Sequence, residues 1–155
     1  MRRTRLADRD CSIAKSVDAV GDPWTLLVVR DALLGVSRFE DFQRRLGTPR
    51  ATLSSRLSQL VEIDVLTKDD EGGYHLTDKG RALRPVIVTM MQWGDRWVRD
   101  DEPPTRLVEE GTGRSIRPIL VDEETRVPLD ELRIRAEGAV TDGLPHRTGA
   151  DEPAL

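Results

Sequence analysis

The stretch 37–62 constrains the fold of this chain most, because it holds two helical patterns with a tight break between them. Ser37 and Glu40 have the S-x-x-E spacing of a capping box, which predicts the start of the first helix. Gly47 is placed to end that helix in the left-handed conformation, which glycine adopts at little cost. Thr48 predicts the cap of a second helix, 49–62, with a proline in its first turn. Two helices joined by a short turn are therefore expected.

The second of these helices has two unlike faces. Its apolar stripe consists of Leu53, Leu57, Leu60 and Val61. Its opposite face is small and hydroxylated with basic flanks, and consists of Ala51, Ser55, Ser58 and Glu62, flanked by Thr52, Arg56 and Gln59. Such groups can enter a DNA groove and bond base edges and phosphates, whereas a merely solvated helix usually carries Lys/Glu pairs. The stretch predicts a helix-turn-helix DNA reader, with an ordinary helical hairpin as the alternative.

The two expected kinds of DNA contact fall on different residues. The expected base readers are Thr52, Ser55, Arg56 and Gln59, of which Arg56 has the geometry to read guanine. The expected backbone contacts are Arg38, Arg50, Ser54 and Lys68. Residues 1–60 carry 11 Lys/Arg against 7 Asp/Glu, and residues 100–155 carry 7 against 14. This asymmetry is typical of a basic reading head with an acidic remainder.

The segments on either side complete a winged-helix pattern. Ser12 predicts the cap of a helix whose inward residues are Ile13, Val17 and Val20. Asp22 and a proline open the next helix, which is apolar almost all round and is therefore expected at the centre of the domain. After the reader helix, 65–68 and 74–77 predict two strands joined by an acidic turn, which together form a wing.

A long helix, 78–99, is predicted next, with Thr77 as its cap. Its apolar residues repeat at steps of three and four, and are Leu83, Val86, Met90, Trp93 and Trp97. Such a stripe beyond a complete small core favours pairing with a second copy, with folding back onto its own domain as the alternative. With Trp24 and Met91, the stripe also offers a cleft for a flat aromatic effector, although Met and Trp at helical spacing are usually core residues.

The ends of the chain have a different composition. Residues 1–10 predict a flexible N-terminal arm, and 11–99 the winged helix-turn-helix domain with its dimerisation helix. Three β-like runs, 106–110, 115–121 and 132–136, predict a small β extension within 100–137, followed by a disordered tail at 138–155. The expected fold class is mainly α with a β wing (α+β).

The sequence contains few residues or motifs that could support catalysis or bind a metal ion. The chain has one cysteine and two histidines, and no P-loop, G-x-S-x-G or H-E-x-x-H motif, so we expect neither an enzyme nor a metal or cofactor site. No apolar run of membrane-spanning length and no signal peptide is present, so a cytoplasmic protein is expected. Cys11 opens a predicted helix near Lys15, which favours thiolate, and it is the one redox candidate. Simple packing of Cys11 is the alternative.

Several ordered motifs give the chain a family resemblance. They are Cys11, Gly21-Asp22-Pro23-Trp24-Thr25-Leu26-Leu27, Arg38-Phe39-Glu40-Asp41-Phe42, Thr52-Leu53-Ser54-Ser55-Arg56-Leu57, Leu76-Thr77-Asp78-Lys79-Gly80 and Trp93-Gly94. In this order and spacing the chain resembles the HxlR-type winged-helix transcriptional regulators of bacteria. The resemblance implies a homodimer, paired through terminal helices, that binds an inverted-repeat operator and answers to oxidants, electrophiles or small apolar effectors.

Two departures from that family qualify the resemblance. Some relatives have a cysteine-rich, zinc-ribbon-like C-terminal piece, whereas residues 105–136 here contain neither Cys nor His, so no zinc is expected. The predicted wing is short and acidic, which weakens its expected phosphate role. The sequence as a whole predicts a dimeric regulator, more a repressor than an activator, that inserts helix 49–62 into the major groove of double-stranded DNA. A protein-interaction module with a degenerate DNA surface is the alternative.

Overall fold

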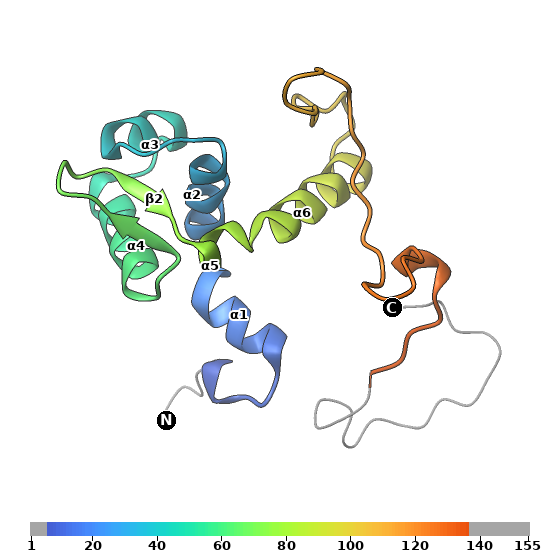
Figure 1. Cartoon of the computed structure of the whole chain (residues 1–155). Coiled ribbons are helices and arrows are strands. Elements are labelled where there is room, and N and C mark those ends of the chain that lie inside the picture. The colour runs from blue at the N-terminus through green and yellow to red at the C-terminus, as the bar shows by residue number, and fades with distance from the viewer. Residues whose placement is uncertain (1–5, 137–155) are drawn as a thin grey trace. The chain divides into compact units, whose positions relative to one another are not determined.

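The computed structural model describes residues 6–136, which fall into two compact units that divide between Arg99 and Asp100. The described part is mostly helical and has one two-stranded antiparallel sheet, as expected for a winged helix. Figure 1 shows the elements, which are η1 (Leu6–Asp8), α1 (Ser12–Val20), α2 (Pro23–Leu33), α3 (Phe39–Leu46), α4 (Arg50–Glu62), β1 (Leu66–Lys68), β2 (Tyr74–Leu76), α5 (Asp78–Arg81), α6 (Arg84–Trp97) and η2 (Leu129–Glu131).

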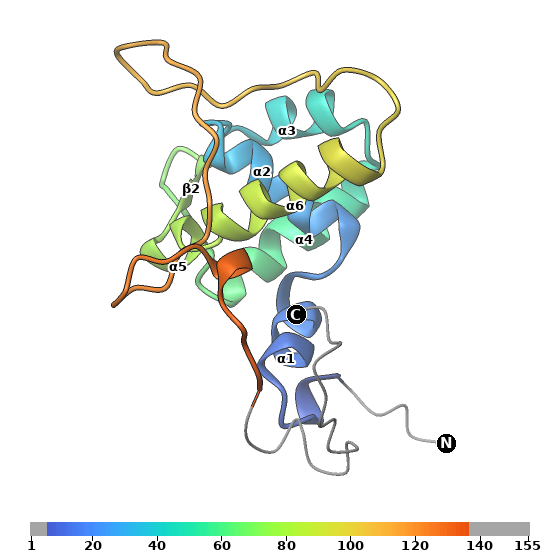
Figure 2. The same cartoon turned by 90° about the vertical axis from the view of Figure 1, so that its right-hand side faces the viewer.

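The hydrophobic core lies where α2, α3, α4 and β1 meet. Its fully buried apolar side chains are Val28, Val29, Phe42, Leu53, Leu57, Leu60, Val65 and Leu66. Burying a side chain of this size stabilises a fold by about 1.5–3 kcal/mol. The predicted stripe of the reader helix is therefore confirmed, and so is the central place of α2, which contacts α3, α4, α6 and β2 (Figure 2).

The turn between α3 and α4 has the expected glycine but not the expected caps. Gly47 ends α3 with φ 63°, in the left-handed region. Ser37 is not the cap of α3, because Arg38 holds that position and the Ser37 carbonyl accepts the Tyr74 N–H at 2.8 Å. Thr48 does not cap α4 either: its side chain is buried, and the helix begins one residue later. The N-cap is Pro49, whose ψ of 140° is extended.

The wing forms where it was predicted. β1 and β2 pair with Leu66 opposite Leu76 and Lys68 opposite Tyr74. The N–H of Gly73 donates to Asp69 Oδ1 at 2.6 Å and closes the acidic turn. Since the N–H of Tyr74 donates to the carbonyl just before α3, the wing is also held against the start of the helix-turn-helix.

The predicted long helix 78–99 is two helices, α5 and α6. Thr77 caps α5 as expected, since its hydroxyl accepts the Gly80 N–H at 3.1 Å. The break falls at Ala82 and Leu83 because Pro85 has no N–H to donate to the Arg81 carbonyl, and its ring would clash with that carbonyl in a continuous helix. α6 contacts α2, and Leu83 just before it packs against the core, whereas Figure 1 shows the later part of α6 extending away from the other helices of this unit.

The apolar residues of α1 face outward, contrary to expectation. Ile13 is 75% exposed and Val17 is 47% exposed, and only Val20 reaches the core. The helix starts at Ser12, and its N-cap residue is Cys11. α1 contacts mainly η1, and only Val20 in its last turn packs on the core, so Ile13 and Val17 are left exposed.

The C-terminal unit has turns but no continuous strand within its described residues, 100–136, so the three predicted strands are wrong. Two isolated bridges take their place, Val108 with Ser115 and Val121 with Pro128. Short runs bury too little surface to form a sheet, and Ile119 is exposed. The tail predicted at 138–155 lies outside the described residues, as do the first five residues of the predicted arm.

Candidate nucleic-acid interface

The outer face of α4 carries short polar side chains over an apolar core. Ala51, Ser54, Ser55 and Ser58 are exposed, and Thr52 is half-buried beside them. Leu53, Leu57 and Leu60 on the inner face are fully buried. The helix is thus held from behind, while its hydroxyl groups face solvent. This is the arrangement in which a helix can enter a DNA groove with its backbone already ordered.

The other two expected base readers lie at the side of α4 and point to the corner between α1 and α2. Arg56 Nε is 3.1 Å from Asp22 Oδ1, an ion pair whose alignment falls short of a hydrogen bond. Arg56 Nη1 donates to Gln59 Oε1 at 3.1 Å. Gln59 Nε2 donates in turn to the Ala19 carbonyl at 3.3 Å. Reading a base with either side chain would require breaking these contacts.

The expected backbone contacts have different surroundings. Arg38 donates to the Glu71 carbonyl at 2.7 Å and pairs with its carboxylate at 3.1 Å, which ties the start of α3 to the wing tip. Arg50 donates to Gln43 Oε1 at 2.9 Å, and its guanidinium lies 4.6 Å from the Phe39 ring centre. Ser54 and Lys68 are both exposed. The positive charge of Arg38 is therefore partly neutralised within the protein.

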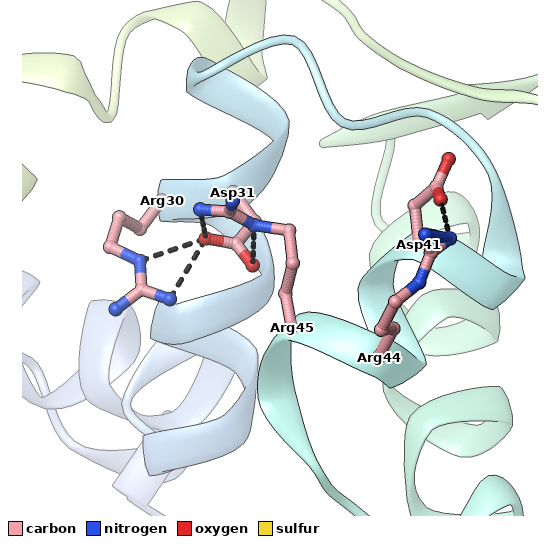
Figure 3. A network of polar contacts seen from close by, with 5 residues as sticks. All are labelled: Arg30, Asp31, Asp41, Arg44 and Arg45. Carbon is pink, nitrogen blue, oxygen red and sulfur yellow. Dashed lines mark hydrogen bonds and ion pairs between the residues drawn. The ribbon is translucent and has the colours of Figure 1, made fainter.

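Sequence reasoning missed a buried carboxylate behind the interface. Asp31 in α2 is fully buried and receives arginines from two helices, as Figure 3 shows. Arg30 Nη2 lies 2.8 Å from Asp31 Oδ1, and Arg45 Nε of α3 lies 3.1 Å from Oδ2. The hydrogen bond and the charge of Asp31 raise the pKa of Arg45 above its ordinary value. The sequence signal that could have revealed this carboxylate is the adjacent pair Arg30-Asp31 within an otherwise apolar helix.

Figure 3 also shows a contrasting pair on the outer side of α3. Arg44 contacts Asp41 three residues earlier, and both side chains are well exposed. This pair joins residues of one helix, whereas the Asp31 cluster joins α2 to α3. Only the second arrangement can help set the angle between α2 and α3.

The apolar residues expected at a dimer or effector surface differ in how far they are buried. Trp93 is 61% exposed and Trp97 is 65% exposed, with Val86 and Met90 exposed on the same stripe of α6. Trp24 and Met91 are half-buried, and Leu83 packs on the core. Cys11 is half-buried, next to the ion pair between Asp10 and Lys15 at 3.9 Å. The exposed part of the set therefore belongs to one helix.

Two further properties concern the whole described region. Among residues 6–136, no group of three or more His, Cys, Asp or Glu side chains is placed to hold a metal ion. Within the same residues, no helix is long and apolar enough to span a membrane.

Comparisons with known proteins agree with this geometry. The HxlR-like helix-turn-helix family matches residues 19–102. An HTH-type transcriptional regulator of Mycobacterium tuberculosis is 40% identical over 117 residues, which cover 71% of this chain and 74% of the relative. HTH-type transcriptional regulators of Bacillus subtilis and Synechocystis are also similar, at 33% identity over 92 residues and 30% identity over 98 residues.

Solved structures show the same fold. The crystal structure of PA1607, a proposed transcription factor, matches with a TM-score of 0.73 and 36% identity, and covers 86% of this chain and 100% of that one. Quinone-bound YodB from Bacillus subtilis matches with a TM-score of 0.52 and 25% identity, and covers 56% and 99%. With an exposed α4 face, a two-stranded wing and a family match over more than half of its length, this chain belongs to the HxlR-like helix-turn-helix family of DNA-binding transcriptional regulators.

Proposed function

We propose that this regulator is a homodimeric repressor that inserts α4 into the major groove of an inverted-repeat operator. The observation that carries the proposal is the outer face of α4, where exposed hydroxyl groups stand on a helix whose inner face is fully buried. Such a helix presents hydrogen-bonding groups to base edges and loses little conformational entropy on binding.

The proposed contacts follow from exposure. Ser55 is exposed, Thr52 lies half-buried beside it, and both are assigned to base edges. Arg50, Ser54 and Lys68 are exposed and are assigned to phosphates. Arg38 joins them when DNA competes with Glu71 for its guanidinium. Arg56 and Gln59 reach base edges only by leaving the α1–α2 corner, and a different role for them is argued below.

The homodimer is proposed from the exposed apolar stripe of α6. Large side chains such as Trp93 and Trp97 rarely stay in water on a monomer, because burying each of them is strongly favourable. The outward-facing Ile13 and Val17 of α1 extend the apolar surface available for pairing. A twofold pair would place two α4 helices on half-sites about one helical turn of DNA, roughly 34 Å, or a multiple of it, apart.

The deciding experiment is a fluorescence-anisotropy titration with DNA from upstream of the protein's own gene, at two salt concentrations and with nonspecific competitor. Tight, sequence-selective binding that weakens steeply with salt is expected, because phosphate contacts release counterions. Binding that is indifferent to sequence and salt would contradict the proposal.

The dimer is tested separately by sedimentation equilibrium of Trp93→Glu. A buried charge at the pairing surface should convert the protein to monomers and lower operator affinity about 100-fold or more, because the two half-site contacts are no longer linked. Leu34→Glu is the matched control, since Leu34 is equally exposed but lies at the end of α2. Equal behaviour of the two variants would rule out pairing through this stripe.

An effector response is proposed at the N-terminus of α1. Cys11 is half-buried at the N-cap of that helix, and a structural relative was crystallised with a quinone bound. Treatment with a quinone or peroxide should lower operator affinity of the wild type but not of Cys11→Ser. If the effector is instead a flat aromatic compound held near the α6 tryptophans, it should quench their fluorescence in both proteins.

One observation favours the alternative of a protein-interaction module. Two arginines that are expected to meet DNA already face carboxylates within the protein, Arg38 at Glu71 and Arg56 at Asp22. A protein partner would bind with a much weaker salt dependence than DNA does. The two-salt titration therefore separates the alternatives.

A further inference from the structure

We infer that Arg56 and Gln59 are positioning residues, which hold the recognition helix α4 at a fixed rotation against the corner between α1 and α2. The inference rests on the proposed function, in which α4 enters the groove. It differs from base reading because the two side chains would act on DNA through the serines and threonine beside them, without touching a base.

The contacts form a continuous bridge from one helix to two others. Arg56 and Gln59 are three residues apart on α4, so their heads meet, with Arg56 Nη1 donating to Gln59 Oε1 at 3.1 Å. Arg56 Nε faces Asp22 Oδ1 at 3.1 Å, at the start of α2. Gln59 Nε2 donates to the carbonyl of Ala19, in the last turn of α1. The bridge thus spans about 40 residues of sequence.

The carboxylate at the far end of the bridge is a rigid anchor. Asp22 caps α2, and its Oδ1 accepts the Trp24 N–H at 3.0 Å and the Thr25 N–H at 3.2 Å. A carboxylate in this position is also favoured by the helix dipole. The side chains of Arg56 and Asp22 are only 30% and 33% exposed, so water screens their attraction less than it screens an open surface pair.

Positioning matters here because the proposed base readers are short. An arginine can reorient to reach a base, whereas the hydroxyls of Ser55 and Thr52 have one rotatable bond and little reach, so the helix backbone sets where they lie. A binding group must be held within about 0.5 Å and 10–20° of its productive geometry. The buried leucines of α4 hold it to the core without directional bonds, whereas the polar bridge at its side is directional.

The test is a double-mutant cycle on operator affinity with Asp22→Asn and Arg56→Met. Asparagine keeps an oxygen that can cap α2 but removes the charge, and methionine keeps most of the arginine stem without the guanidinium. Each variant should weaken operator binding about 3- to 30-fold and reduce discrimination at all the base pairs that Ser55 and Thr52 read, because both hydroxyls lose their fixed position. The double variant should bind the operator no more weakly than the weaker-binding of the two single variants, because both substitutions break the same bridge.

Two results would overturn the inference. If Arg56→Met relaxes discrimination at one base pair per half-site while Asp22→Asn leaves affinity unchanged or raises it, Arg56 reads that base directly. If neither variant changes affinity, the bridge does not position the helix. Gln59→Met removes the other arm of the bridge without changing the charge, and it should lower operator affinity as much as Arg56→Met does. Arg56→Lys should lower operator affinity less than Arg56→Met.

A second readout keeps the inference separate from the proposed function. Amide hydrogen exchange in α4, measured without DNA, should be faster in Asp22→Asn, Arg56→Met and Gln59→Met, while exchange in α3 stays unchanged. Arg114→Met is the matched control, because it removes one arginine from an ion pair with Glu109 in the C-terminal unit. Absence of selective DNA binding by the wild type would refute the proposed function alone, whereas unchanged exchange in α4 would refute the bridge.

Discussion

At the scale of single residues, Asp31 makes the clearest prediction about stability. Its fully buried carboxylate pairs with Arg30 of its own helix and with Arg45 of α3. Asp31→Asn should lower the free energy of unfolding by about 1–3 kcal/mol, because the two arginines lose their shared charge partner while keeping contact with water. Urea unfolding followed by circular dichroism measures this loss.

The control for Asp31 is the exposed carboxylate of α3. Asp41→Asn breaks the surface pair with Arg44 and should change stability by less than about 0.5 kcal/mol. If the two variants were destabilised equally, the Asp31 cluster would have no special role in joining α2 to α3.

The wing contains a second residue-scale prediction, which concerns pH. The His75 hydrogen bond at 2.7 Å, helped by the Gly73 N–H, lowers the pKa of Asp69 below its ordinary value of 3.8. Because the folded-state pKa is the lower one, this stabilisation of the wing is present above pH 3.8 and is lost as pH falls through the lowered value. His75→Ala should therefore raise the pKa of Asp69, measured by carbon-detected NMR titration of the carboxyl group.

An internal control for that titration is Asp122 in the C-terminal unit. The backbone N–H and hydroxyl of Thr125 lower the pKa of Asp122, and neither depends on His75. The Asp122 titration should be the same in both proteins. An unchanged Asp69 titration in His75→Ala would show that the turn backbone alone lowers its pKa.

At the scale of one element, substitutions along α4 should distinguish residues that contact bases from residues that contact phosphates. Ser55→Ala should lower affinity by about 0.5–1.5 kcal/mol for the operator but not for a variant with the contacted base pair changed. Arg50→Ala should weaken binding to all sequences alike and reduce the salt slope by about one, because one phosphate contact is lost. Anisotropy titrations against a panel of single-base operator variants measure both effects, and the opposite pattern would reverse the assignment.

At the scale of the whole molecule, stability should reside in the first unit. Within the described residues, every buried residue lies between Thr25 and Gly80, and residues 100–136 contribute none. A chain that stops after Arg99 should therefore unfold cooperatively, within about 3 °C of the full chain at equal protein concentration. Differential scanning calorimetry tests this, and a non-cooperative or much lower transition would show that the C-terminal unit supports the core.

The elements that sequence predicted correctly rest on local chemistry. Asp22 before a proline, Gly47 after an amphipathic run and Thr77 before α5 act through bonds or torsions within a few residues, and all three end or begin helices as expected. The leucine stripe of α4 also follows from spacing alone. Ser37 and Thr48 were predicted wrongly as caps, because pairing with the wing and an extended Pro49 outweighed local capping.

The sequence by itself determined the order of helices, the wing and the place of the reader helix, because periodicity and turn residues encode them locally. Only the tertiary structure decided which polar side chains are available to DNA. Arg56 is basic and lies beside the outer face of α4 in sequence, yet Asp22, 34 positions earlier, faces its guanidinium. Likewise, the partners of the buried Asp31 include Arg45 on another helix. Attraction between distant charges depends on how elements pack, and that packing is not written in the spacing of neighbouring residues.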